Sequence, residues 1–570
     1  MKLFFKILFV FVFIFSLSQA NAQKRKKIST KKATYTKPKI ASTSNDNRIS
    51  LDSSKPGVLT VTSTFKPFLR SAAKVNFTAS APVLDTSRFT LSYDIPAQNL
   101  VFSYLPVAIK PIALNEANPF TWVNNQYVKL GYGNYSTPYL ETGLAFGNPT
   151  STLFTIHGKY VSSKGNILFQ ENTNADIKLN AVFAAIPNHE LITSLNYNLS
   201  QQYKYGVNPN HTFSKDQLKQ NFNTIEFEAL LHSKSDNEFG ISYHPNIKTS
   251  FFSDNHQGNE TNIKVDAPFA KMINDEIKVG IAVVADITSY KSSSSTISNN
   301  LFSIQPKLEY NNSDLNIKAA FNATWNNNEL VYLPDLSAEY KLASEKFVVF
   351  GGYKTYFQKN TYQSLAKTNP FIYQPTELLN TKINEIYGGL KGSINKHFSY
   401  RGNLSFLKFT NQVLFINDQV ESKSQNFNTF YEPDLKAIRI GGEITYIDKE
   451  KFNFVTSVNY TQFTAQQQYE KVFGFLPIEI NSSLKYHLFK DVFLKSDLFL
   501  WDGAHYKVKT NDIGKSNMVV DLNIGVEMKV VKRTNIFLDF NNLFNNQYQR
   551  WNQYNVFGFN VVGGVVYSFH

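Results

Sequence analysis

The chain has 570 residues, of which 49 are Phe and 31 are Tyr, and its mean hydropathy is nevertheless negative. No run of 18 apolar residues occurs, which excludes transmembrane helices, and the absence of Cys excludes disulfides, thiolate metal sites and a lipidated N-terminal Cys. The net charge of +14 comes mostly from ten Lys and Arg residues before position 40, so it does not indicate a nucleic-acid-binding body.

Residues 1–22 have the layout of a secretory signal peptide. Lys2 and Lys6 precede the apolar run 7–15, which is too short to span a bilayer. Small residues at positions 20 and 22 then predict cleavage between Ala22 and Gln23. The alternative is an uncleaved anchor. We therefore expect an exported protein.

Residues 23–55 form a basic segment in which no acid precedes Asp46. Its Lys, Ser, Thr, Asn and Pro residues predict a disordered tail after export. Such a tail could bind an anionic cell-wall polymer, lipid or an acidic partner, or could simply be solvated. Export takes it away from nucleic acid, so we expect no nucleic-acid partner.

Residues 56–120 differ from the tail because they contain short β-type runs, among them 58–61, 65–69 and 99–105. Five prolines separate these runs into extended pieces. The segment is too short and too interrupted for a large independent domain, and it predicts an element that packs against something else.

Residues 121–570 show the alternation of apolar and polar residues that is typical of β-strands with two different faces. The runs 277–283, 315–323 and 520–530 are clear examples. Many strands have about ten residues or more, the length that a tilted strand needs to cross a bilayer. An apolar face and a polar face then fit a transmembrane β-barrel with lipid outside and a hydrated interior.

The turns predict the number of strands. Ten tight polar turns with one strand outside each end give about 22 antiparallel strands, with short turns on the periplasmic side. The predicted tight turns are 147–150, 187–190, 234–237, 274–276, 311–314, 344–346, 395–397, 448–451, 490–491 and 531–534. The predicted longer outer loops include 161–174, 203–221, 253–262, 290–300, 356–381 and 505–517.

Four prolines follow a common pattern in this region. Pro306, Pro334, Pro433 and Pro477 are each followed by a β-type run. Proline has no N–H for the ladder of a sheet and is tolerated where a strand begins. We therefore expect each of them at the first position of a strand that descends from the outer rim.

The C-terminus is the most specific stretch of the sequence. The segment 541–548 reads NNLFNNQY, Trp551, Tyr554 and Gly558 follow it, and a last β-type run ends at Phe569. This stretch resembles the end of TonB-dependent receptors, of the Bacteroidetes type. The resemblance implies a 22-stranded barrel in the outer membrane of a Gram-negative cell. It also implies that Tyr567 and Phe569 belong to a C-terminal signal read by the barrel assembly machinery, although His570 departs from the pattern.

The front of the chain departs further from that family, whose members have a globular plug of well over a hundred residues before the barrel. The hexamer 58–63 resembles the short segment that such receptors offer to TonB, with Leu59, Thr60, Val61 and Thr62 at its centre. The alternative is an ordinary extended strand. Because natural proteins fill barrels of this width, either residues 56–120 act as a reduced plug or a partner protein caps the lumen.

The sequence indicates no enzyme. It contains no nucleophile elbow, no HExxH motif and no P-loop, and we expect no catalytic, cofactor or metal residues. The resemblance implies transport across the outer membrane; the alternatives are a plugless scaffold subunit of an assembly or secretion complex, and a passive porin.

Inward acids at 335, 339, 521 and 527 fit a hydrated interior or a substrate contact. Aromatic residues of the loops fit a girdle at the lipid headgroups better than a ligand platform: Phe371, Tyr373, Trp501, Tyr506, Trp551 and Tyr554.

Overall fold

The computed structural model describes residues 126–148, 150–206, 213–417, 426–448, 451–509 and 512–569. The predictions for the cleavage site at Ala22 and Gln23, for the basic tail, for residues 56–120 and for the TonB-like segment around Thr60 lie outside the described residues.

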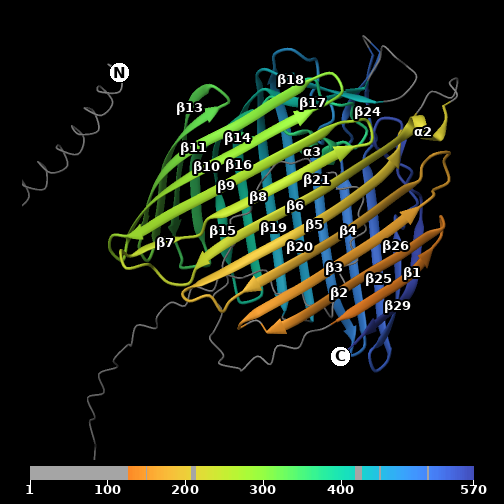
Figure 1. The fold of residues 1–570 in the computed structure, drawn as a ribbon, viewed down its shortest axis with the longest axis horizontal. Helices are drawn as coiled ribbons and strands as arrows, with labels where there is room; N and C mark the ends of the chain where they lie inside the picture. Colours follow the sequence, from red (N-terminus) through yellow and green to blue (C-terminus); the bar gives the residue numbers. More distant parts are fainter. Residues whose placement is uncertain are drawn as a thin grey trace, which may run out of the picture. The chain divides into compact units, whose positions relative to one another are not determined.

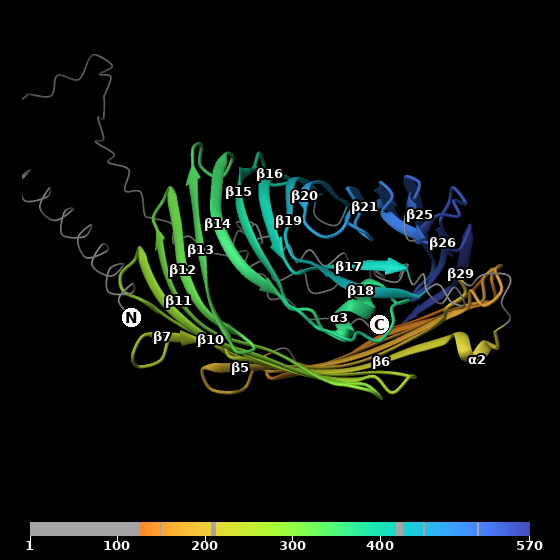
Figure 2. The same ribbon diagram turned by 90° about the horizontal axis from the view of Figure 1, so that it is seen from above.

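The described chain forms a closed antiparallel β-barrel, whose strands are shown in Figures 1 and 2. The wall strands are β1 (Tyr127–Gly133), β2 (Thr137–Asn148), β3 (Thr152–Ser163), β4 (Asn172–Phe183), β5 (His189–Tyr203), β6 (Lys219–Ser233), β7 (Ile241–Tyr243), β8 (Asn246–Asp254), β9 (Asn259–Met272), β10 (Ile277–Lys291), β11 (Thr296–Asn311), β12 (Leu315–Asn326), β13 (Glu329–Lys341), β14 (Val348–Gln358), β15 (Thr381–Ser393), β16 (Phe398–Thr410), β19 (Leu435–Asp448), β20 (Phe452–Gln466), β21 (Ile478–Phe489), β22 (Val492–Trp501), β25 (Val519–Val531), β26 (Thr534–Asn541) and β29 (Asn560–Ser568).

The wall has 22 positions although it contains 23 strands. The short β7 and the longer β8 both pair with β9, so together they occupy one position of the ring. The first strand closes the ring because β1 pairs with β2 on one side and with β29 on the other, with Tyr127 opposite Ser568. The predicted fold and strand number are confirmed.

The alternation in the sequence becomes the two faces of the wall. In β2, Tyr139 and Glu141 are buried on the inner face, whereas Leu140 and Phe146 are exposed on the outer face. The same exposure of large apolar side chains recurs around the wall, for example at Ile386. An apolar outer belt is what a bilayer stabilises, because lipid takes the place of a protein core on that side.

Within the described residues, no helix is long and apolar enough to cross a membrane.

All ten predicted tight turns connect neighbouring wall strands at one end of the barrel, which we call the turn end. Left-handed backbone conformations occur there at Asn188, Ser344 and Arg533, and the turn after β2 uses Gly147 with φ of 99°. The N-terminal end of β1 and the C-terminal end of β29 lie at the turn end, so the first and last described residues are on that side of the barrel.

The opposite end, which we call the loop end, carries two kinds of connection. Four are short, at 134–136, 255–258, 292–295 and 327–328. The predicted long loops at 253–262 and 290–300 are therefore wrong, because β8 and β9 extend into the first and β10 and β11 into the second, which leaves only four-residue turns. The connections after β3 and β20 are longer and carry no helix or strand within the described residues. The remaining connections carry further elements, namely α2 (Lys215–Leu218), α3 (Tyr362–Thr368), β17 (Gln412–Asn417), β18 (Phe427–Glu432), β23 (His505–Lys509), β24 (Asp512–Lys515), β27 (Gln549–Trp551) and β28 (Tyr554–Asn555).

The expectation for the prolines holds for two of the four. Pro477 directly precedes β21 and Pro433 lies two residues before the first residue of β19, but Pro306 and Pro334 lie inside β11 and β13. The structure accommodates Pro306 by pairing it with Ile281 of β10, while the ladder to β12 skips its position. The N–H that Pro306 lacks would therefore lie at a position where the ladder between β11 and β12 is already interrupted.

Candidate functional site

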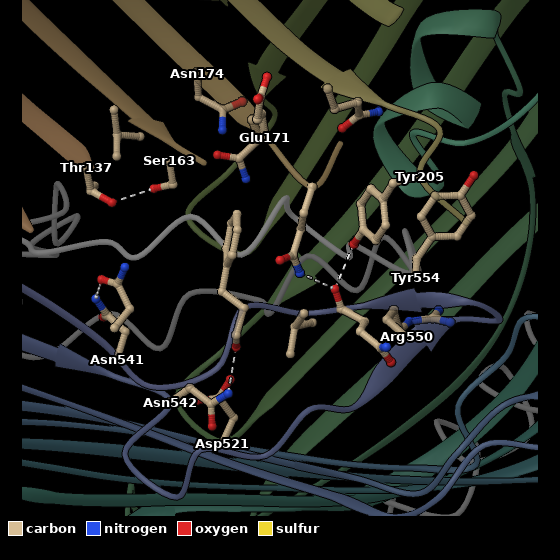
Figure 3. A pocket seen from close by; sticks show the side chains of 18 of the residues that line it. Thr137, Ser163, Glu171, Asn174, Tyr205, Asp521, Asn541, Asn542, Arg550 and Tyr554 are labelled. Carbon is tan, nitrogen blue, oxygen red and sulfur yellow. Dashed lines mark hydrogen bonds between the residues drawn. The ribbon is translucent and has the colours of Figure 1, made fainter. Parts of the chain in front are cut away.

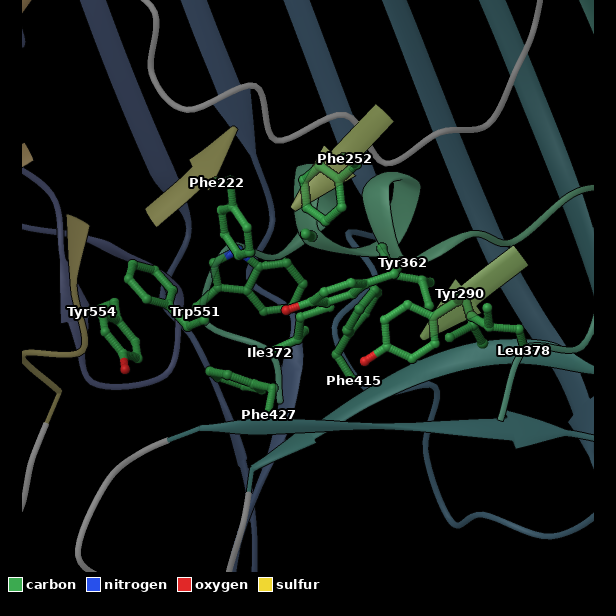
Figure 4. Packing of buried hydrophobic residues seen from close by; sticks show 14 residues of the cluster. Phe222, Phe252, Tyr290, Tyr362, Ile372, Leu378, Phe415, Phe427, Trp551 and Tyr554 are labelled. Atoms are coloured by element: carbon green, nitrogen blue, oxygen red, sulfur yellow. The ribbon is translucent and has the colours of Figure 1, made fainter. Parts of the chain in front are cut away.

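Four of the long connections of the loop end, those after β14, β16, β20 and β26, pack against one another, and we call them the loop cap. It comprises residues 359–380, 411–417, 426–434, 467–477 and 542–559. Together with side chains of the wall, the segments 359–380, 411–417, 426–434 and 542–559 form one apolar cluster, shown in Figure 4, whose buried members are Phe222, Phe252, Tyr290, Tyr362, Leu365, Ala366, Phe371, Ile372, Leu378, Val413, Phe415, Phe427, Trp551 and Tyr554.

Ring contacts join parts of the loop cap that come from distant wall strands. The ring of Tyr554 stacks on Phe371 with a centroid distance of 3.5 Å, and Trp551 meets Phe415 and Phe427 at 5.3 Å each. Phe371 follows β14, whereas Tyr554 follows β26, and the strands β16, β19, β20, β21, β22 and β25 lie between their connections in the ring. The contact therefore requires the loops to leave the wall and cross the mouth.

Polar contacts attach α3 to the inner face of the wall. The carboxylate of Glu260 accepts hydrogen bonds from the backbone N–H groups of Tyr362, at 2.5 Å, and Gln363, at 3.2 Å. The hydroxyl of Tyr362 donates to Asp254 at 2.7 Å. A carboxylate at a helix start satisfies N–H groups that have no partner within the helix, so Glu260 fixes the position of α3.

A buried amide network holds the two ends of the α3 connection. The side chain of Asn299 donates to the backbone of Asn360 and to Asn380, both at 2.9 Å, and Asn380 also donates to Asn326 at 2.8 Å. Lys359 forms an ion pair with Asp286 of β10. Burial lowers the pKa of Lys359, and the neighbouring carboxylate opposes that shift.

The rest of the loop cap is joined by charged side chains that bind backbone groups. The carboxylate of Glu432 accepts hydrogen bonds from the N–H groups of Gln467, Gln468 and Tyr469. The guanidinium of Arg550 donates to the carbonyl of Gly474 at 2.9 Å, and burial lowers its pKa to about 10. These bonds tie the connection after β20 to those after β16 and β26.

The loop cap corrects the prediction of an aromatic girdle. Phe371, Trp551 and Tyr554 are buried in the apolar cluster, and Trp501 is buried with Tyr548 in a second one. None of these four faces lipid. The residue types of a girdle and of a packed loop core are the same, so composition did not distinguish them.

A pocket lies beneath the loop cap, against the wall on both sides of the ring closure, and Figure 3 shows its lining. It has a volume of about 130 Å³. The lining comes from β2 to β5 on one side, from β25, β26 and β29 on the other, and from residues 542–559 above. It consists mostly of amide and aromatic side chains, including Gln170, Asn172, Asn174, Gln202, Tyr205, Asn541, Asn542, Tyr548, Tyr554, Asn555, Phe557 and Asn560.

Several hydrogen bonds of the lining join the loop cap to the wall. The carbonyl of Asn555 accepts from Gln170 at 2.9 Å and from Tyr205 at 2.7 Å, and Gln202 donates to the carbonyl of Pro370 at 2.8 Å. Burial raises the pKa of Tyr205, so its hydroxyl stays protonated as a donor. The pocket is therefore a built space between fixed elements.

Buried charges lie beside the pocket at the ring closure. Lys129 is fully buried, lies 3.8 Å from the centroid of the Phe537 ring, and pairs with Asp539 at 3.5 Å. Glu141 accepts hydrogen bonds from the hydroxyls of Tyr127, at 2.9 Å, and Tyr139, at 2.5 Å. Tyr139 and Asp539 also line the pocket, so its lower wall is set by this cluster.

The acids predicted to face inward differ in burial. Asp521 and Glu527 are buried, whereas Glu339 is partly exposed and pairs with Lys391 at 2.6 Å.

Tyr567 and Phe569 lie on the outer face at the turn end, 44% and 41% exposed, with their rings edge to face at 5.2 Å. Their role in assembly stays a prediction. Sequence reasoning did not single out Asn172, Asn174, Glu260 or Glu432, because isolated polar residues at strand and loop ends carry no local signal.

Among the described residues, no group of three or more His, Cys, Asp or Glu side chains is arranged to hold a metal ion.

Comparison with known proteins finds similarity in structure only. No protein-family model and no curated protein sequence matches the chain. Solved structures that it resembles include the iron transporter FrpB of Neisseria meningitidis, with a TM-score of 0.61 and 8% identity over 79% of this chain and 82% of that one. Others are the pyoverdine outer-membrane receptor FpvA of Pseudomonas aeruginosa PAO1 (TM-score 0.59, 10% identity, 78% of each chain) and the siderophore receptor PirA of Acinetobacter baumannii (0.59, 10%, 78% and 80%).

These three structures are an iron transporter and two outer-membrane or siderophore receptors. At this level of identity, the comparison establishes the 22-stranded barrel fold and leaves the function to the site.

Proposed function

We propose that this chain is an outer-membrane barrel of the TonB-dependent receptor type that takes up a small polar solute through its loop end. The observation that carries the proposal is the loop cap with a pocket beneath it. A passive pore needs an open mouth, whereas here Tyr554 and Phe371 join loops from distant parts of the ring. The likeness in fold to outer-membrane iron transporters and siderophore receptors supports the same reading.

Coupling to TonB is the part of the proposal that is tested most directly. The chain contains no Cys, so a single Thr60→Cys variant can carry a thiol-specific photo-crosslinker without a background of other thiols. In intact cells, a crosslink from position 60 to TonB is expected. The matched control is Thr36→Cys in the basic tail, which is expected to give no TonB crosslink. Equal crosslinking from both positions, or none from position 60, contradicts the coupling.

Residues 56–120 are proposed to act as a reduced plug of the lumen. Deleting them and measuring single-channel conductance in planar bilayers is expected to raise the current of the deletion variant above that of the intact barrel. A current that stays unchanged contradicts an internal plug and favours a partner protein that caps the lumen.

Tyr567 and Phe569 are proposed to form the signal read by the barrel assembly machinery. Phe569→Ala is expected to reduce the amount of heat-modifiable barrel in the outer membrane several-fold. Val565→Ala removes a similarly exposed apolar side chain on the same face, four residues before Phe569, and serves as control. Equal losses in both variants contradict a special role for the last aromatic residue. The Bacteroidetes type stays a prediction from the sequence.

A scaffold in an outer-membrane assembly or secretion complex is the second candidate. It is favoured by the way the cap aromatics pack against one another, as Trp551 does on Phe415 and Phe427, instead of facing outward as a ligand platform. Purification of the intact protein from detergent-solubilised outer membrane separates the two functions. Large partners in stoichiometric amounts support the scaffold, and a lone barrel that crosslinks to TonB supports the receptor.

A further inference from the structure

The pocket beneath the loop cap contains a buried acceptor that lacks a donor. Asp521 is 1% exposed, and one oxygen of its carboxylate, Oδ2, accepts a hydrogen bond from the Tyr548 hydroxyl at 2.7 Å. The other oxygen, Oδ1, has no hydrogen-bond partner within the described part of the chain. Buried polar atoms are nearly always hydrogen-bonded, so the position calls for a donor that water or a ligand supplies.

Two amides across the pocket have spare hydrogen-bonding capacity as well. Asn172 and Asn174 line it from the start of β4, and within the described residues their side chains make no hydrogen bond. Figure 3 shows Asn174 and Asp521 on opposite sides of the space. Each amide offers donors and an acceptor, whereas Asp521 offers an acceptor only. A ligand between them must both donate and accept, as hydroxyl groups do.

The charges of the lining are matched except at Asp521. Three acids line the pocket, Glu171, Asp521 and Asp539, against two cations, Lys159 and Arg550. Glu171 pairs with Lys215 and Asp539 with Lys129. Arg550 donates through Nη2 to the Gly474 carbonyl, and its Nε and Nη1 have no hydrogen-bond partner within the described residues. A carboxylate, phosphate or catecholate oxygen placed against Asp521 Oδ1 would be repelled, whereas a hydroxyl group can donate to Asp521 and accept from other groups of the lining.

The size and the apolar surfaces of the pocket select a ring. A volume of about 130 Å³ is close to that of cavities which hold one benzene-sized molecule. Tyr205, Tyr548, Tyr554 and Phe557 bring aromatic surface to the lining, on which the C–H face of a flat or puckered ring can lie.

We infer that the pocket between Asn174 and Asp521 binds one ring of a neutral, hydroxyl-rich molecule, the size of a single sugar unit. The inference rests on the proposed receptor function, whose substrate class it names. Hydroxyl groups of the ligand donate to Asp521 Oδ1 and exchange hydrogen bonds with the amides of Asn172 and Asn174, while an aromatic side chain covers one face of the ring.

Isothermal titration of the full-length barrel in detergent tests the inference. The probes are D-glucose, D-galactose and D-mannose and their methyl glycosides, with gluconate and ferric citrate as anionic counterparts. At least one neutral sugar is expected to bind, and the anions are expected not to bind. Asp521→Asn keeps the size of the side chain but turns the free acceptor into a donor, so affinity is expected to fall at least tenfold. Asn174→Ala is expected to reduce it about fivefold.

The matched control is Asn322→Ala, which removes an inward amide from β12 and is expected to leave the affinity unchanged. Heat-modifiable mobility confirms that each variant is a folded barrel. Binding of no neutral sugar, binding of an anion in its place, or equal affinity in all variants overturns the inference. A crosslink from position 60 to TonB without sugar binding would support the receptor function and contradict the sugar site. Sugar binding without that crosslink would support the site and contradict the coupling to TonB.

Discussion

In the barrel wall, large apolar side chains such as Ile386 and Phe406 are more than half exposed, whereas in the loop cap the side chains of Phe427 and Trp551 are buried. The wall is held by continuous ladders of backbone hydrogen bonds between neighbours in the ring, and its outer side chains are stabilised by lipid. The loop cap has only short ladders and is held by ring packing and by side chains that bind backbone groups.

The wall and the cap can therefore fail separately. Loss of a side chain in the cap removes contacts between segments that no ladder joins, so the cap can open while the wall stays closed. A change on the outer face of the wall acts on insertion into lipid and leaves the contacts of the cap in place. A variant in one region should therefore change that region and leave the other as it was.

The largest effect is expected for Trp551→Ala. The indole is 3% exposed and contacts Phe415 and Phe427, and removal of a buried Trp costs about 3–5 kcal/mol. We expect much faster hydrogen exchange in residues 359–380 and 411–417, measured by mass spectrometry, with unchanged heat-modifiable mobility of the barrel. Trp325→Ala, at a partly buried site in β12, is the control. A variant that loses the barrel as well would show that cap and wall are one cooperative unit.

Next in size is Leu404→Arg in the middle of β16, where the side chain is 41% exposed on the outer face. An arginine near the middle of the bilayer costs about 2–4 kcal/mol. We expect a lower free energy of unfolding from lipid vesicles in urea, while hydrogen exchange in the cap remains as in the parent. Leu404→Val should stay close to the parent. A loss of similar size in both variants would mean that packing and not lipid contact decides this position.

The pH dependence of the cap is expected to come from Lys204, which follows β5, is 8% exposed and lies 5.3 Å from the Tyr373 ring centroid. Burial lowers its pKa from 10.5 to about 8, with Asp254 opposing the shift. Between these pH values the unfolded state binds more protons, so the stability of the cap rises with pH, by up to about 3 kcal/mol. Hydrogen exchange of residues 359–380, corrected for its intrinsic pH dependence, should slow across this window.

Lys204→Met should remove most of that rise and should stabilise the cap at pH 7, because the variant has no charge to bury at position 204. Burial also lowers the pKa of Lys359, so a smaller rise should remain. Lys215→Met removes a lysine that is exposed on α2 and should keep the full rise. A rise of undiminished size in Lys204→Met would assign the effect to another group.

The smallest effect is expected for Glu260→Gln in β9, whose side chain contacts the start of α3. The carboxylate accepts hydrogen bonds from the N–H groups of Tyr362 and Gln363, and the weaker acceptor should cost about 1–2 kcal/mol. Exchange should rise in residues 362–368 and not in β17 or β18. Glu228→Gln, a partly buried acid on β6, is the control. An increase throughout the cap would show that α3 anchors all of it.

The sequence by itself determined the wall. Period-2 alternation and turn residues are local signals, so the ten turns and the closing strand around Val565 were predictable before any contact was known. The wrong predictions for Pro306 and for residues 253–262 have one cause. A strand that continues beyond the bilayer keeps the same alternation of apolar and polar residues, so the sequence does not show where such a strand leaves the bilayer. Nothing in the local pattern marks where the membrane ends.

Only the tertiary structure decided the cap and the pocket. Aromatic residues such as Phe371 and Tyr554 fit a lipid girdle as well as a packed core until their distance of 3.5 Å is known. Asn174 and Asp521 lie 347 positions apart in the sequence and line one pocket because β1 pairs with β29. Closure of the ring is a property of the whole sheet, and it brings the first strands of the barrel next to the last ones.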